Sequence, residues 1–230
     1  MTDRREELAK HLDQVRAEIA TAARAAHRQP EEISLVVVTK NFPASDVEHL
    51  IALGVSDVGE NREQEGSSKS SEVRSSINWH FIGQLQRNKV KSVLEWANVI
   101  HSVDRIELAE EIVKRAVGRS QILRVLVQVS LDSAPGRAGA PRSELNEIAS
   151  LLATSPMVEL SGLMAVAPLD EDPRAAFHRL QAIRADFISD FPEAVWCSAG
   201  MSGDFAAAIE FGATHVRIGS SILGSRPTFG

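Results

Sequence analysis

The sequence of 230 residues contains no tyrosine and a single cysteine, Cys197. One cysteine excludes a disulfide within the chain, which fits a reducing cytoplasm. No run of 18 apolar residues occurs, so we expect no membrane-spanning helix. The first residues, Met1-Thr2-Asp3-Arg4-Arg5, are charged where a secretory signal would be apolar. We therefore expect an unprocessed cytoplasmic protein.

Strong basic charge is also missing. A formal net charge of −6 and an isoelectric point near 5.7 argue against a general nucleic-acid-binding protein. The seven histidines show no metal-ligand spacing, so we expect no metal. With 43% hydrophobic and 24% charged residues, the composition is that of an ordinary globular protein.

One apolar segment, residues 33–40, organises the rest of the chain. It reads Ile-Ser-Leu-Val-Val-Val-Thr-Lys, which is rich in β-branched residues and predicts a parallel strand buried on both faces. Parallel sheets bind ligands at the carboxyl ends of their strands, and here that end carries Lys40. Residues 45–48, Ser-Asp-Val-Glu, then have the form of a helix capping box. Asp104 is likewise expected to cap the helix that begins at residue 106.

Strand and helix patterns alternate along the whole chain. An amphipathic helix over about 3–27 comes first, and residues 1–30 should pack on the main body. Eight strand-to-helix units in about 200 residues predict a closed (β/α)8 barrel, and no linker divides the single domain, 1–230. An open doubly wound sheet is the alternative, but its Gly-rich cofactor turn is absent. The expected strands are 33–40, 55–59, 77–83, 98–103, 122–129, 158–166, 194–198 and 215–218, and the expected helices between and after them are 45–53, 62–74, 88–96, 106–117, 142–154, 173–189 and 204–211.

Lys40 and two glycine- and serine-rich turns carry the chemical signal. A lysine past a strand end is either a surface residue or a Schiff-base lysine. Residues 198–204 and 217–221 either cradle a phosphate or form tight turns with helix caps. In a closed barrel the eighth strand adjoins the first, which places this cradle beside Lys40. Such a pair suits pyridoxal 5'-phosphate, with Arg217 either at its ring nitrogen or at the surface.

Several segments together resemble the YggS/PROSC family of pyridoxal phosphate homeostasis proteins. The resemblance runs in order from about residue 33 to 226. It rests on Val-Thr-Lys at 38–40, Gly-Glu-Asn-Arg-Glu-Gln-Glu at 59–65, Trp-His-Phe-Ile-Gly-Gln-Leu-Gln-Arg-Asn-Lys at 79–89, His-Ser-Val-Asp at 101–104, Gly-Leu-Met at 162–164, Gly-Met-Ser-Gly-Asp at 200–204 and Val-Arg-Ile-Gly-Ser at 216–220.

The resemblance implies a barrel similar to the N-terminal domain of alanine racemase. It also implies that this barrel binds pyridoxal phosphate covalently, without established turnover. Two departures, Gln84 in place of a common histidine and Gly-Arg-Ala-Gly at 136–139, affect loop behaviour and partner contacts rather than the cofactor site. By this match the aldimine lysine is Lys40, the phosphate contacts are Ser202, Gly219 and Ser220, the ring-nitrogen partner is Arg217, and Asn61 and Met201 line the same pocket.

The missing tyrosine bears on catalysis. The related racemases use a tyrosine as their second base, so racemisation by that mechanism is excluded. His80 and His101 either protonate or stack on the cofactor, or are packed histidines with hydrogen bonds. Cys197 is expected to be a core residue rather than a nucleophile.

Three functions remain open at this point. The first is a carrier that buffers, stores and delivers pyridoxal phosphate to apoenzyme clients, and we expect it to be a monomer. The second is a racemase-like pyridoxal phosphate enzyme acting on amino acids. The third is a cofactor-free Schiff-base aldolase. The basic stretch 87–91 is either a docking surface for clients or a solvated helix face.

Overall fold

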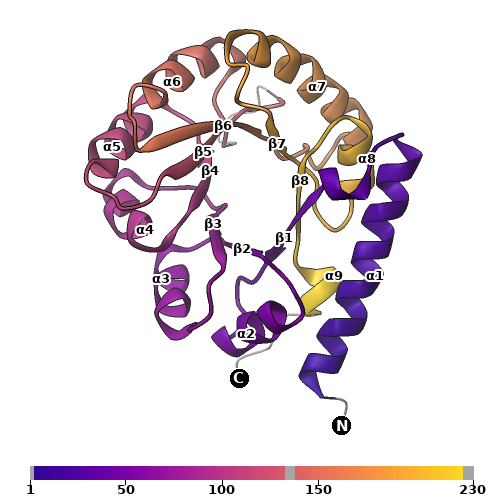
Figure 1. The fold of residues 1–230 in the computed structure, drawn as a ribbon. Coiled ribbons are helices and arrows are strands. Elements are labelled where there is room, and N and C mark those ends of the chain that lie inside the picture. The colour runs from indigo at the N-terminus through magenta and orange to yellow at the C-terminus, as the bar shows by residue number, and fades with distance from the viewer. Residues whose placement is uncertain (1–2, 133–137, 225–230) are drawn as a thin grey trace.

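The eight strands form a closed parallel barrel in which each strand pairs with its neighbours in chain order. The computed structural model describes residues 3–132 and 138–224. Figure 1 shows the strands as an inner ring with helices around it, which confirms the (β/α)8 prediction. The strands are β1 Ser34–Val38, β2 Asp57–Glu60, β3 Asn78–Phe81, β4 Val99–Val103, β5 Leu123–Gln128, β6 Val158–Met164, β7 Trp196–Ser198 and β8 His215–Ile218.

Helices follow the strands and cover the outside of the barrel. The α-helices are α1 Arg4–Ala25, α2 Ala44–Ala52, α3 Glu63–Glu72, α4 Val90–Trp96, α5 Ile106–Ala116, α6 Leu145–Leu152, α7 Pro173–Asp190, α8 Phe205–Glu210 and α9 Ser220–Leu223. Short 3-10 turns occur at Pro30–Glu32, Arg87–Lys89 and Arg142–Glu144.

The barrel closes between β1 and β8. Val36 pairs with Arg217, and Val37 pairs with Ile218. Both valines are fully buried, as expected for a β-branched strand covered on both faces. This closure brings the end of β8 beside the residue that follows β1, Lys40.

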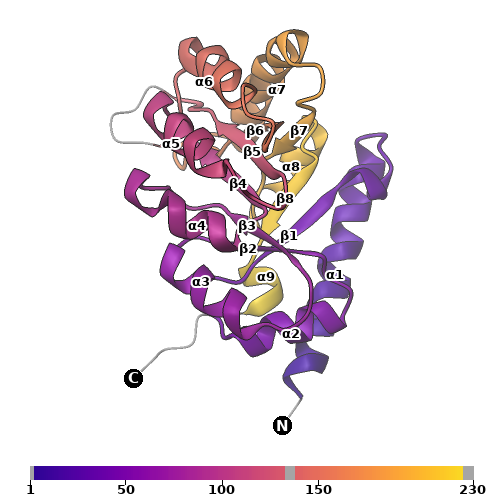
Figure 2. The same cartoon turned by 60° about the vertical axis from the view of Figure 1, so that its left-hand side comes forward.

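Helix α1 precedes the barrel and packs against its outside. Its buried face carries Leu8, Leu12, Val15 and Ile19, which are the apolar positions of the amphipathic pattern. The helix contacts α2, α8 and α9, and Figures 1 and 2 show it running along that side of the barrel. It therefore joins the first and last parts of the chain.

The inside of the barrel is partly polar. Side chains alternate between the two faces of a strand, and the two large apolar clusters lie between the strands and the helices. A small cluster of Val99, Leu126 and Met164 packs separately from them. Buried polar residues occupy other positions of the strands, among them His80, His101, Ser198 and Arg217.

Two predicted helix caps are wrong. Ser45 lies inside the first turn of α2, whose N-cap is Pro43, and Glu48 instead accepts hydrogen bonds from the Arg74 amide and the Ser75 hydroxyl. The N-cap of α5 is Arg105 rather than Asp104, and the Asp104 carboxylate pairs with the Arg105 guanidinium.

Two further differences concern loops. Helix α9 was not expected, because its four residues, Ser-Ser-Ile-Leu, are too few to show a helical period. The predicted departure at 136–139 falls partly outside the described residues.

Candidate functional site

A cavity of about 390 Å³ lies at the carboxyl ends of β1, β2 and β8. Its walls combine apolar side chains, among them Val38, Phe42 and Ile82, with a few polar groups, a mixture that is typical of small-molecule sites. The structure brings all seven residues predicted from the sequence to this cavity: Lys40, Asn61, Met201, Ser202, Arg217, Gly219 and Ser220.

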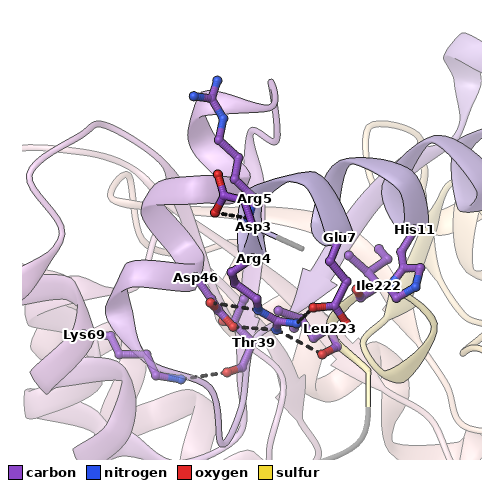
Figure 3. A network of polar contacts seen from close by, with 10 residues as sticks. All are labelled: Asp3, Arg4, Arg5, Glu7, His11, Thr39, Asp46, Lys69, Ile222 and Leu223. Carbon is purple, nitrogen blue, oxygen red and sulfur yellow. Dashed lines mark hydrogen bonds and ion pairs between the residues drawn. The ribbon is translucent and has the colours of Figure 1, made fainter. Parts of the chain in front are cut away.

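The backbone on both sides of Lys40 is held by α3. The Nζ atom of Lys69 donates to the carbonyl oxygen of Thr39 over 2.7 Å (Figure 3). The amide of Asn41 donates to the Glu65 carboxylate. Asn41 has φ of 67°, a left-handed conformation that asparagine tolerates better than most residues. The Lys40 side chain itself makes no hydrogen bond or ion pair with the described residues, so its amine is uncommitted.

Lys69 is the centre of a buried ionic cluster. Its ammonium lies 2.8 Å from Oε1 of Glu60 and 2.7 Å from Oε1 of Glu65. The Thr39 hydroxyl donates to the same Glu60 oxygen over 2.6 Å. Burial raises the pKa of Glu60, although Lys69 and Thr39 act in the opposite direction. This cluster was not predicted from the sequence, although Glu65 and Lys69, an acidic and a basic residue four apart on a helix, are a recognisable signal.

Arg217 is a buried guanidinium without a carboxylate partner among the described residues. It is only 5% exposed. It donates to Ser198 Oγ over 2.7 Å and to the carbonyl oxygen of Ala165 over 3.0 Å. Burial lowers its pKa to about 10. A guanidinium has five N–H donors, and burying such a charge is costly unless its donors are used. The cavity therefore suits a ligand that offers Arg217 a hydrogen-bond acceptor.

Another part of the cavity lining consists of hydroxyls and glycines. The Ser202 and Ser220 hydroxyls lie 3.3 Å apart and join the two loops. A Cβ atom at Gly203 would meet nothing within 4 Å, whereas one at Gly219 would lie 2.9 Å from the Val38 carbonyl oxygen. Gly219 therefore permits the close approach of the β8 loop to β1.

The two helices beside the cavity, α8 and α9, are short, which determines the groups that can bind an anion there. Helix α8 has six residues and α9 has four. Neither is long enough for a strong macrodipole. Hydroxyls and individual backbone N–H groups at the starts of these helices are therefore the donors that the site offers to an anion.

Helix α1 holds α9 in place. Arg4 donates to Asp46 Oδ2 over 2.7 Å and to the Leu223 carbonyl oxygen over 3.0 Å. His11 Nδ1 lies 3.0 Å from the Ile222 carbonyl oxygen. Figure 3 shows these groups converging on the end of α9, the helix that starts with Ser220. The N-terminal helix therefore supports one wall of the cavity.

Other residues singled out in the sequence lie away from this cavity. His80 and His101 are buried and hydrogen-bonded to each other, which is the packed arrangement. Burial raises the pKa of the Cys197 thiol to about 11, as expected for a core residue. Within the described residues no acidic, histidine or cysteine side chains gather to hold a metal ion. No helix in that part of the chain has the length and apolar character needed to cross a bilayer.

A second cavity of about 780 Å³ adjoins the first, and the two share Phe42 and Asn61. It is lined by the start of α3 and the loop before α4, including Gln84. Its Lys89 ammonium is paired with Glu63 over 3.2 Å. The uncommitted lysine and the buried arginine both lie in the smaller cavity, which is therefore the candidate site.

The profile of the family described as alanine racemase, N-terminal domain, matches residues 11–227. The chain belongs to this family. Within the alanine racemase N-terminal domain family, similar proteins are called pyridoxal phosphate homeostasis protein. The one from Mycobacterium bovis is 40% identical over 244 residues and covers 97% of this chain and 95% of its own. The one from Escherichia coli is 36% identical over 227 residues, with 96% and 97% covered. The predicted YggS/PROSC resemblance is confirmed.

A solved structure of the same family has the same fold. PipY of Synechococcus elongatus, determined with pyridoxal phosphate bound, is 30% identical, has a TM-score of 0.80 and matches 94% of this chain and 100% of its own.

Proposed function

We propose that this protein binds pyridoxal 5'-phosphate as a Schiff base on Lys40 and buffers, stores and delivers it. The observation that carries the proposal is one cavity that holds an uncommitted lysine, a buried arginine and two hydroxyls. The names of the relatives and the ligand of PipY support it.

Each lining residue has a role that fits its chemistry. The bound cofactor supplies an aldehyde for reversible imine formation and a phosphate for anchoring. Lys40 provides the amine, and Arg217 donates to the ring nitrogen. The Oδ1 atom of Asn61 is buried without a partner among the described residues, so it can accept a hydrogen bond from the ligand. The phosphate contacts are Ser202, Gly219 and Ser220, and Met201 covers the rim.

Delivery requires only amine exchange. An incoming amine would take the place of the Lys40 amine, and Lys40 would be released as a free amine, so no oxidant or reductant is involved. We infer a carrier without catalytic turnover, because no tyrosine is present to act as a second base. We also propose that residues 1–230 act as one domain, a cytoplasmic monomer whose transient clients are apoenzymes.

The test is the visible absorption spectrum of the purified protein, recorded before and after borohydride. Lys40→Ala is compared with Lys89→Ala, which removes a paired lysine from the neighbouring cavity. We expect a yellow band in the parent and in Lys89→Ala, and no band in Lys40→Ala. Peptide mass spectrometry should find the reduced adduct on Lys40.

Other outcomes decide between the alternatives. A colourless protein that fails to take up added pyridoxal phosphate would refute the proposal and favour the cofactor-free aldolase. Reproducible turnover of amino acids, lost in Lys40→Ala, would make the protein an enzyme rather than a carrier.

A further inference from the structure

Five buried or partly buried side chains form an unbroken line of hydrogen bonds through the barrel. Asp57 Oδ1 lies 2.9 Å from Nε2 of His80, and Nδ1 of His80 lies 2.8 Å from Nε2 of His101. Nδ1 of His101 lies 2.9 Å from Ser198 Oγ, which accepts from Arg217 over 2.7 Å. The line begins at the first residue of β2 and ends at the guanidinium that borders the candidate site.

The chemistry of the end groups fixes the direction of these bonds. Burial would raise the pKa of Asp57, but hydrogen bonds from His80 and Ser56 outweigh it and lower that pKa to about 2. An ionised carboxylate only accepts, so Nε2 of His80 must carry a proton. In a neutral His80, Nδ1 then accepts from the Nε2–H group of His101.

The same reasoning continues to Arg217. In a neutral His101 the remaining nitrogen, Nδ1, accepts from the Ser198 hydroxyl. Burial, the largest cause, lowers the pKa of His101 well below its usual value, which agrees with a neutral ring. Ser198 then accepts from Arg217, so each ring nitrogen of His80 and His101 has one partner in one role.

The surroundings leave few other partners. His101 and Ser198 are fully buried, and His80 is 1% exposed. The titratable and charged groups that act on the two histidines are Asp57 of β2 and Arg217 and His215 of β8. His215 hydrogen-bonds to Thr214 and lies outside the line.

We propose that Asp57, His80, His101 and Ser198 form a one-directional hydrogen-bond relay that positions Arg217 as a donor facing the cavity. The relay makes the four side chains positioning residues, which act on a ligand only through Arg217. The ligand atom facing Arg217 must then be an acceptor, such as an unprotonated ring nitrogen. That last point rests on the proposed function, whereas the relay itself does not.

The relay is tested first in the protein without added ligand. Two-bond ¹H–¹⁵N correlation spectra at pH 7.5 distinguish the two neutral histidine tautomers and the charged ring. We expect both His80 and His101 to be neutral with the proton on Nε2. A charged His80, or a His101 proton on Nδ1, would reverse the line and overturn the proposal.

A second test alters the far end of the relay. Asp57→Ala removes the acceptor, whereas Asp57→Asn keeps an oxygen that can accept from His80. For Asp57→Ala we expect a changed His80 tautomer, a shifted visible band and roughly three- to tenfold weaker binding of pyridoxal phosphate. Asp57→Asn should restore the tautomer and the band. His215→Asn, a buried histidine outside the relay, is the matched control.

The outcomes separate the relay from the proposed function. Unchanged tautomers and an unchanged band in Asp57→Ala, or an equal band shift in His215→Asn, would refute the relay. If the parent protein takes up no pyridoxal phosphate, the proposed function fails, and the tautomers still decide whether the relay exists.

Discussion

The ammonium of Lys69 lies 2.7 Å from the carbonyl oxygen of Thr39, the residue directly before Lys40. The same ammonium pairs with Glu60, whose carboxylate is fully buried. Removing one partner of a buried pair leaves an uncompensated charge. We therefore expect Lys69→Met to lower the free energy of unfolding by about 3 kcal/mol in urea titrations.

Two variants control this experiment. Lys91 is exposed, so Lys91→Met should leave stability nearly unchanged. Combining Lys69→Met with Glu60→Gln removes the unpaired charge and should recover part of the loss. A double variant as unstable as Lys69→Met alone would show that the buried charge is not the cause.

Stability should fall as the pH drops from about 6.5 toward 4. Burial lowers the pKa of His215 to about 4, and it also lowers the pKa of His101 well below its usual value. In this window the unfolded chain binds protons that the folded chain does not. The free energy of unfolding is therefore greatest above the usual pKa of histidine and decreases below it. Each histidine contributes about 1.4 kcal/mol per pH unit.

Urea midpoints measured at pH 7 and at pH 5 check this expectation. His215→Asn should reduce the slope of the free energy of unfolding against pH by the contribution of one histidine. His178 is exposed, and His178→Gln should leave the pH dependence as it is. A parent protein with equal stability at both pH values would contradict the expectation.

Arg4 and Arg5 offer a matched pair of substitutions at the start of α1. Arg4 donates to Asp46 and to the Leu223 carbonyl oxygen, whereas Figure 3 shows the Arg5 side chain pointing away from this network. Arg4→Met should therefore loosen α9, and Arg5→Met should not. Hydrogen exchange of residues 216–224 is the measurement. Equal exchange in the two variants would show that α1 does not support α9.

Cys197 should be unreactive in the folded protein. Its thiol is 1% exposed, and burial raises its pKa to about 11, so little thiolate forms at pH 8. We expect a disulfide reagent to modify it only after denaturant is added, when one thiol per chain should react. Rapid modification without denaturant would contradict the buried position.

The strands were predictable because their signal is local. β8 occupies the four residues that its apolar pattern indicated, 215–218. The capping box predicted at Ser45 was wrong although the sequence has the residues for it. The N-cap of α2 is Pro43, so the helix begins before Ser45. Helix boundaries depend on one or two backbone angles, and several nearby residues can satisfy the same pattern.

Only the residues that line the site were predictable from the sequence. Lys40 follows β1 and Arg217 lies in β8, and closure makes these strands neighbours, so topology alone placed the two residues together. The line from Asp57 to Arg217 was not predictable. His80 and His101 are 21 residues apart and meet only through the register of the barrel.

Successive residues of β8 have two different roles, packing and cavity lining. Val216 and Ile218 pack in the apolar cluster that includes α1, whereas Arg217 between them lies at the ligand cavity. Thermal stability and ligand affinity can therefore change independently along one strand. Substitutions at Val216 or Ile218 could therefore change the packing between the barrel and its helices, and substitutions at Arg217 could change ligand preference, in separate steps. Random substitutions in β8 should accordingly fall into two classes, those that shift the melting temperature and those that shift binding.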